Sequence, residues 1–280
     1  MDSSKVIDQT LKEIESLISL PEIYLKYREL MDDPDSTNDA FSGVVGSDPN
    51  LAAIVLKIVN SPLYGYSGGI DSINRAIHYI GINQVHDLVL ATSAMALDVP
   101  NEIVPIKTFW RNSLFSGVLA RLLGNELKML ASECLFVIGL LHQIGSLVIY
   151  AKYSEQARQA ITLAKENHET IDKAEMNILD FNYAQVGAKL MAQWRLPTKF
   201  QVITYFHPNP TDAPTYRKET SLLHLVHSYV YQQSSGTDLS IEQLVNPEVW
   251  GILNVTTEQM QTVLEEAKQV SADMEKFILK

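Results

Sequence analysis

The uncharged stretch from Cys134 to Ala151 constrains the fold of this chain more than any other segment. It lies between Glu133 and Lys152 and carries the polar pair His142 and Gln143 near its middle. A helix that is apolar on nearly all sides must be buried in a large core or in a membrane. Because an unpaired buried polar group costs roughly 1–3 kcal/mol, both polar side chains need partners. The sequence therefore predicts a buried central helix that belongs to a bundle core, to a chemical site, or to both.

The charge balance limits the class of partner. The 280 residues suffice for one large or two modest domains, and 46% of them are hydrophobic, as in globular proteins. The 22 basic and 33 acidic residues give a formal net charge of −11, with no run of Lys or Arg. Since nucleic-acid binding depends on clustered cations, we expect no nucleic-acid partner. An acidic surface favours protein partners instead.

The cysteine content and the N-terminal residues bear on the compartment. A single cysteine, Cys134, excludes an internal disulfide, fits a reducing cytoplasm and is expected to be a buried structural thiol. The first residues lack the apolar core of a signal peptide. Only the segment Cys134–Ala151 approaches the ~20 apolar residues of a membrane span, and its central polar residues weigh against that interpretation. We therefore expect a cytoplasmic protein without membrane insertion.

Helix signals are clear in the first hundred residues. Asp48 and Pro49 are typical of an N-cap and a first helical residue, and the helix that follows is expected to end at Pro62. Asn60 could bond the backbone of the next loop or form part of a partner surface, and ordinary loop chemistry favours the structural role. A further helix is capped by Asp71 or Ser72 and closes at Gly81.

The remainder of the chain also shows helical spacing and almost no strand signal. The apolar periodicity predicts helices over residues 83–97, 109–123, 154–168, 171–179, 183–195, 197–207, 217–233 and from 240 to the C-terminus. Two Val-Pro pairs near residues 98–106 indicate a boundary between lobes. The expected fold class is all-α.

The common catalytic motifs are absent from the sequence, and histidines are what remain. We find no glycine-rich phosphate loop, no paired cysteines, no zinc-protease helix and no nucleophile elbow. His142, His207, His224 and His227 could in principle meet around a metal, because neutral imidazole is a common ligand. The simpler interpretation is a hydrogen-bonded core histidine, a helix-end histidine and a half-exposed pair. The carboxylates that a hydrolytic metal site needs do not lie near His142 in the sequence.

The segment Leu140–Gly145 resembles the Leu-His-Asp-Ile-Gly signature of the HD superfamily of metal-dependent phosphohydrolases. In that superfamily the His-Asp pair, an earlier His and a later Asp hold one or two metal ions that activate water for attack on phosphate esters. The wider chain is more similar to an offshoot, the HDOD domain (HD-related output domain). The ordered pieces that carry this resemblance lie at Leu20–Tyr24, Asp48–Leu51, Val59–Tyr64, Ile73–Gly81, Phe109–Ser113, Gly139–Gly145 and Val186–Pro197.

The departures from the superfamily pattern bear on function. Asn112 stands where the first metal-binding His is expected, Gln143 replaces the Asp of the His-Asp pair, and Ser228 lies near the expected late Asp. Tyr183 and Phe206 stand where related sequences often carry further histidines. Replacing Asp by Gln removes the negative charge that anchors a divalent cation.

The resemblance therefore implies a vestigial metal site at Asn112, His142, Gln143 and Ser228, with His142 and His207 as the possible surviving ligands. We expect no metal, no other cofactor and no catalytic residues. The implied architecture is a multi-helix bundle in which an N-terminal helical lobe (1–105) packs on an HD-like helical core (106–235), followed by a C-terminal helical extension (236–280).

Three functional hypotheses follow from the sequence. The leading one is a non-catalytic, HDOD-type bacterial signalling protein that acts by binding signalling proteins, with a homodimer left open. The second is a divergent phosphohydrolase or phosphodiesterase that acts on a nucleotide or cyclic dinucleotide. A contact between His142 and Asp180 or another acidic residue would support this hypothesis. The third is a small-molecule sensor that keeps the old phosphate-ester pocket without its metal.

Overall fold

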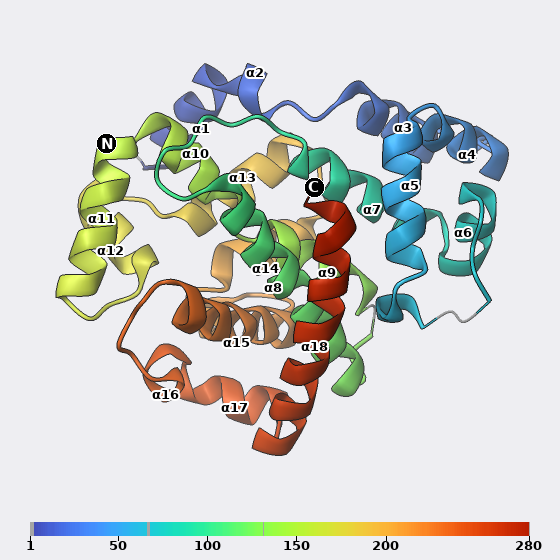
Figure 1. Ribbon diagram of the computed structural model, residues 1–280. Coiled ribbons are helices and arrows are strands. Elements are labelled where there is room, and N and C mark those ends of the chain that lie inside the picture. The colour runs from blue at the N-terminus through green and yellow to red at the C-terminus, as the bar shows by residue number, and fades with distance from the viewer. Residues whose placement is uncertain (1–2, 66–67, 131, 280) are drawn as a thin grey trace. The chain divides into compact units, whose positions relative to one another are not determined.

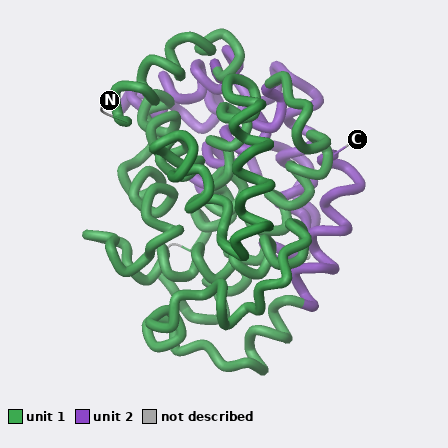
Figure 2. Tube along the Cα trace, turned by 90° about the vertical axis from the view of Figure 1, so that its left-hand side faces the viewer, with its two compact units in different colours: residues 1–18, 98–264 green, residues 19–97, 265–280 purple. Residues whose placement is uncertain are grey.

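Every regular element in the described part of the protein is a helix, as the sequence predicts. The computed structural model describes residues 3–65, 68–130 and 132–279, and no strand occurs in those ranges. Contacts divide the chain into two compact units (Figure 2). Unit 1 comprises Met1–Ile18 and Asp98–Leu264, and unit 2 comprises Ser19–Leu97 and Glu265–Lys280. Each unit therefore combines segments that are distant in the sequence.

Unit 2 is built from short helices that pack on one another. The helices that lie wholly within it are α3 (Glu22–Asp32), α4 (Asn38–Gly46), α5 (Pro49–Val59), α6 (Ile73–Ile80) and α7 (Ile82–Met95), with a single 3₁₀ turn at Pro62–Tyr64 (Figure 1). Helix α4 packs on α3 and α6, while α7 packs on α5 and α6. The long helix α18 (Thr257–Ile278) begins in unit 1 and ends in unit 2.

The two predicted helix starts in this unit are confirmed, whereas α5 ends at Val59, before the expected Pro62. Asp48 Oδ1 accepts hydrogen bonds from the backbone N–H groups of Asn50 (2.9 Å) and Leu51 (3.1 Å), with Pro49 at the first helical position. Of the two candidate caps for α6, Ser72 is the one used: its hydroxyl accepts from the Arg75 N–H at 3.3 Å.

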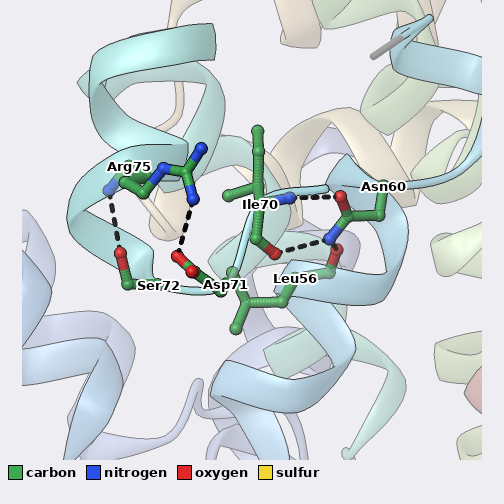
Figure 3. A network of polar contacts seen from close by, with 6 residues as sticks. All are labelled: Leu56, Asn60, Ile70, Asp71, Ser72 and Arg75. Carbon is green, nitrogen blue, oxygen red and sulfur yellow. Dashed lines mark hydrogen bonds and ion pairs between the residues drawn. The ribbon is translucent and has the colours of Figure 1, made fainter. Parts of the chain in front are cut away.

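Asn60 fastens the loop between α5 and α6 (Figure 3). Its Oδ1 accepts from the Ile70 N–H at 2.6 Å, and its Nδ2 donates to the carbonyls of Ile70 (2.7 Å) and Leu56 (2.8 Å). Beyond the loop, Arg75 Nη1 donates to Asp71 Oδ1 at 3.1 Å. The structure therefore gives Asn60 the backbone-bonding role.

Unit 1 holds the larger core. The elements that lie wholly within it are α1 (Ser3–Glu13), α2 (Glu15–Ile18), α8 (Ile106–Glu126), α9 (Glu133–Leu141), α10 (Ile144–Lys152), α11 (Ser154–Glu166), α12 (Ile171–Leu179), α13 (Tyr183–Gln193), α14 (Thr198–Phe206), a 3₁₀ turn at Pro210–Asp212, α15 (Arg217–Ser234), α16 (Ile241–Leu244) and α17 (Pro247–Leu253). Helix α8 packs on α9 and α15, α10 packs on α13, and α11 lies beside α12 (Figure 1).

The central apolar segment is buried but is not one helix, which corrects the sequence prediction. The segment Glu133–Lys152 is long and apolar enough to cross a membrane by composition, yet 78% of its apolar window is buried inside the protein. It divides into α9 and α10 at Gln143, whose φ of −97° and ψ of 8° are not helical. An apolar periodicity does not show such a break, because the side chains on both sides of it are buried alike.

The C-terminal region differs in a similar way. Helix was expected without interruption from residue 240, whereas the structure has three helices there. The first break comes at Asn246 and Pro247, where Asn246 caps α17 by accepting from the Glu248 N–H at 3.0 Å. The second comes at Asn254, whose φ of +51° ends α17 in the left-handed region. Both breaks carry ordinary signals for the start or the end of a helix, but the apolar spacing alone continues through them.

Candidate functional site

Two histidines end core helices of unit 1 in the same manner. His142 follows α9, is 0% exposed, and its Nδ1 donates to the Gly139 carbonyl at 2.6 Å. His207 follows α14, is also 0% exposed, and its Nδ1 donates to the Thr204 carbonyl at 2.7 Å. In each case the ring closes on the carbonyl three residues earlier. That bond fixes the tautomer, so Nε2 is the free acceptor nitrogen of both rings.

These acceptors meet two side chains from other helices. His227 on α15 places its Nδ1 3.1 Å from His142 Nε2. The Tyr183 hydroxyl, at the start of α13, lies 2.8 Å from His207 Nε2 and 3.2 Å from His227 Nε2. We call these four residues, His142, His207, His227 and Tyr183, the histidine–tyrosine cluster. Its members come from four different regions of the chain.

The hydrogen bonds determine where the protons lie. Because His142 Nε2 is an acceptor, His227 must donate from Nδ1, and its Nε2 is then also an acceptor. Tyr183 has one hydroxyl proton for two acceptor nitrogens, those of His207 and His227. A fully neutral cluster therefore leaves one imidazole lone pair without a donor. That lone pair can accept a proton or bind a cation.

Burial keeps the imidazoles neutral. It lowers the pKa of His142 to about 4 and holds the pKa values of His207 and His227 well below the usual value, with the neighbouring imidazoles acting in the same direction. One nitrogen from each of the three rings lies within 4.8 Å of the others. His142 and His207 each have the second ring nitrogen bonded to a backbone carbonyl, as metal-binding histidines typically do, whereas Nδ1 of His227 bonds to His142. The three rings could therefore hold a transition metal such as zinc or nickel only if the hydrogen bonds between them were given up.

The predicted vestigial positions other than His142 line two different cavities. Asn112 and Gln143 line a cavity of about 260 Å³ that none of the three clustered histidines lines. The Ser228 hydroxyl instead donates to the His224 carbonyl at 2.8 Å and lines a second cavity, of about 340 Å³, with His227. A carboxylate-bridged metal site does not fit these residues, because none of them supplies a negative charge.

His224, which the sequence paired with His227, has a separate structural role. Its Nδ1 donates to the His207 carbonyl at 2.7 Å, and its Nε2 accepts from the Asn246 N–H at 3.0 Å. Both ring nitrogens are thus used in joining α15 to neighbouring segments. Of the four histidines considered as ligands, the structure brings three together and excludes His224.

Three functional side chains were missed or undervalued from the sequence. Tyr183 was read only as the loss of a histidine, although its hydroxyl joins two imidazoles. Glu175 on α12 is buried, its Oε2 accepts from the Tyr183 N–H at 2.7 Å, and burial raises its pKa to about 8. Asp172 is buried on the same helix and lines the second cavity. Asp180 instead is exposed and ends α12 with a φ of +62°.

An all-helical core in which a Leu-His-x-Ile-Gly segment joins two buried helices defines a protein of the HD-like class. More specifically, the chain belongs to the HDOD domain family, whose family profile matches residues 17–210. The resemblance drawn from the sequence pieces is thereby confirmed.

Relatives with solved structures share the fold. An HDOD domain protein of unknown function from Geobacter sulfurreducens is 21% identical, with a TM-score of 0.73 over 96% of this chain and 97% of its own. A protein named as a candidate phosphohydrolase, from Shewanella amazonensis SB2B, is also 21% identical, with a TM-score of 0.72 over the same fractions. A candidate signal transduction protein from Marinobacter aquaeolei VT8 is 20% identical, with a TM-score of 0.69 over 100% of this chain and 67% of its own.

One curated relative extends beyond the region matched here. It is an uncharacterized protein of Treponema pallidum (strain Nichols), 23% identical over 216 residues. The match covers 76% of this chain but only 41% of that relative. The likeness therefore concerns a domain and not the whole of the longer protein.

Proposed function

We propose that this chain is a non-catalytic signalling module that acts by binding another protein. One observation supports the proposal above others: Asn112, Gln143 and Ser228, at the three positions where the HD pattern expects metal ligands besides His142, are neutral, and Ser228 lines a different cavity from the other two. A hydrolytic divalent-metal centre needs anionic oxygen ligands to hold the ion and to activate water. A chain without them keeps the helical scaffold as a surface for recognition.

The proposal extends to the setting in which the protein works. We infer a bacterial cytoplasmic protein that does not insert into a membrane. The formal net charge of −11 supports a protein partner and not nucleic acid, and the single cysteine fits a reducing cytoplasm. Affinity purification from native cells, with the captured proteins identified by mass spectrometry, is expected to return a stoichiometric signalling partner. Size-exclusion chromatography with light scattering decides between a monomer and a homodimer.

The absence of catalysis is tested by a hydrolysis assay. We expect no metal-dependent cleavage of an activated phosphodiester such as bis(p-nitrophenyl) phosphate in the presence of Mn²⁺, Ni²⁺ or Zn²⁺. His142→Ala and a control at the exposed His78 on α6, His78→Ala, are assayed alongside. The proposal is contradicted if the parent cleaves the phosphodiester and this activity is lost in the His142 variant but kept in the His78 variant. Only a catalytic site containing His142 produces that difference.

A second candidate function is favoured by the three clustered imidazoles. A divergent metal-dependent phosphohydrolase or phosphodiesterase, acting on a nucleotide or cyclic dinucleotide, would hold its ion through His142, His207 and His227. Such an ion would supply Lewis-acid activation of water. The protein's own contribution would be to orient the rings through the Gly139 and Thr204 carbonyls. The hydrolysis assay above distinguishes this candidate from the first.

A further inference from the structure

The cavity lined by Asn112 and Gln143 has features that the loss of metal ligands does not explain. It lies entirely within unit 1 and is bordered by α8, α10, α11 and α15. We call it the amide cavity, because it is lined by two residues with carboxamide side chains, Asn112 from α8 and Gln143 from the break between α9 and α10. Its volume of about 260 Å³ is slightly below the usual range for ligand pockets. It therefore suits a small ligand.

Both carboxamides are without a protein partner. The side chains of Asn112 and Gln143 are half-buried, and neither forms a hydrogen bond with any of the described residues. Each carboxamide offers two N–H donors and one acceptor oxygen. Half-buried polar groups of this kind normally have hydrogen-bonding partners, since leaving those hydrogen bonds unmade costs free energy. The unused groups in the cavity therefore point to a ligand with donors and acceptors of its own.

The remaining lining mixes aliphatic and aromatic side chains, and its two tyrosine hydroxyls are already paired. The Tyr150 hydroxyl bonds to Ser146, and the Tyr231 hydroxyl bonds to Ser235. What these rings and Phe109 offer the cavity is apolar surface. Aromatic surface beside free amides is the combination that recognises planar heterocycles, by stacking on the faces and hydrogen bonding to the edges.

The charge of the lining limits the charge of the ligand. Among the described residues, no carboxylate lines the amide cavity, and Lys165 is its one cation. Lys165 and Ser234 are exposed, so they mark the side of the cavity that is open to solvent. The inner part is neutral. A ligand can carry one negative group toward Lys165, but its buried part must be uncharged.

We propose that the amide cavity binds a single nucleobase or nucleoside, held by its hydrogen-bonding edge between Asn112 and Gln143. Carboxamides pair bidentately with the donor–acceptor edges of bases, and the aromatic side chains cover the planar faces. The small volume and the single cation favour a ligand with one base over a cyclic dinucleotide, which has two bases and two phosphate groups. This inference goes beyond the proposed signalling function and does not depend on it.

Calorimetric titration of the full chain tests the inference. The probes are adenosine, guanosine, cytidine, uridine, their 5′-monophosphates, cyclic di-GMP, and ribose as a probe without a base. We expect one of the nucleosides or monophosphates to bind at one site per chain, and ribose and cyclic di-GMP to show no binding. If no nucleoside or monophosphate binds at concentrations up to about 1 mM, the inference is wrong.

Variants locate the bound probe. Asn112→Leu and Gln143→Leu keep the approximate size of the side chain and remove the amide, so each is expected to weaken binding by about tenfold or more. Gln159→Leu, at an exposed amide on α11 outside the cavity, is the matched control and should bind normally. If a leucine variant does not fold, Asn112→Asp and Gln143→Glu remove the donors while preserving shape, and the same loss is expected. Binding that survives both amide substitutions overturns the inference.

Discussion

His142 Nε2 and His227 Nδ1 lie 3.1 Å apart, and this contact joins α15 to the junction of α9 and α10 across 85 residues of sequence. Both rings are buried, and His142 is 0% exposed. The contact holds the Leu-His-x-Ile-Gly segment to the helix that carries Ser228, where the HD pattern expects its late Asp. The histidine that survives from the superfamily signature therefore has a structural bond that accounts for its presence without a metal.

His142→Ala is expected to lower the free energy of unfolding by about 3 kcal/mol. The substitution leaves a cavity in place of the ring and removes the partners of the Gly139 carbonyl and of His227 Nδ1. Urea unfolding followed by circular dichroism measures the change. His78→Ala, at an exposed histidine on α6, should stay within about 0.5 kcal/mol of the parent. A loss below about 1 kcal/mol for His142→Ala would mean that the cluster contributes little to stability.

The metal-free protein is expected to lose stability as the pH falls from 6.5 toward 4. Burial lowers the pKa of His142 to about 4 and keeps those of His207 and His227 well below 6.5, so the unfolded chain binds more protons in this window. Each such histidine contributes a slope of about 1.4 kcal/mol per pH unit.

His224, whose pKa is also lowered by burial, adds to this acid sensitivity, and Glu175 opposes it. The Tyr183 hydroxyl, whose pKa burial raises well above its usual value, stays protonated throughout. Urea midpoints measured at intervals of half a pH unit between pH 7 and pH 5 test the prediction. A urea midpoint that stays constant or rises as the pH falls would contradict the claim that the buried imidazoles are neutral.

Glu175→Gln is expected to make the protein more tolerant of alkaline pH. Burial raises the pKa of Glu175 to about 8, above its ordinary value of 4.5, so its contribution to stability is present below pH 4.5 and is lost as the pH rises toward 8. Glutamine keeps an oxygen to accept the Tyr183 N–H and cannot ionise.

Between pH 6 and pH 9 the unfolding free energy of the Glu175→Gln variant should gain about 2–3 kcal/mol relative to that of the parent. Denaturant titrations at the two pH values give this difference directly. Glu166→Gln, at an exposed position on α11, is the control and should show no such gain. Equal pH profiles for the Glu175 variant and the parent would refute a protonated carboxyl at this site.

Gly145→Ala is expected to destabilise the protein by about 3 kcal/mol or more, or to prevent folding. A Cβ at this position would lie 2.1 Å from the Tyr183 carbonyl oxygen and 2.5 Å from the Gly187 nitrogen, so α10 and α13 would have to separate. Gly187→Ala is the matched comparison, because its Cβ would find nothing closer than 3.4 Å. Thermal melts should separate the two variants clearly, and similar melting temperatures would show that the helices are not in close contact.

The sequence predicts the fold well where the signals are local. The caps at Asp48 and Ser72 and the all-helical class follow from residue type and spacing over a few positions. The break at Gln143 does not, since buried apolar residues flank it on both sides.

The candidate site is predicted only in part, because its geometry is tertiary. His142 and His207 were identified through the family pattern, whereas the choice of His227 over His224 depends on which face of α15 meets the end of α9. No spacing along one helix decides that. Tyr183 was undervalued for a different reason. The family pattern treats it only as a missing histidine ligand, whereas its hydroxyl is a hydrogen-bonding partner for two imidazoles.

The metal content of the native protein tests the central claim most directly. The protein is purified from its own cells without chelator and without metal-affinity resin, and its first-row transition metals are measured by inductively coupled plasma mass spectrometry. We predict no metal in stoichiometric amount, because His142, His207 and His227 are joined by hydrogen bonds and lack an anionic ligand. One Mn, Fe, Ni or Zn per chain, absent from His142→Ala and retained in His78→Ala, would contradict the account.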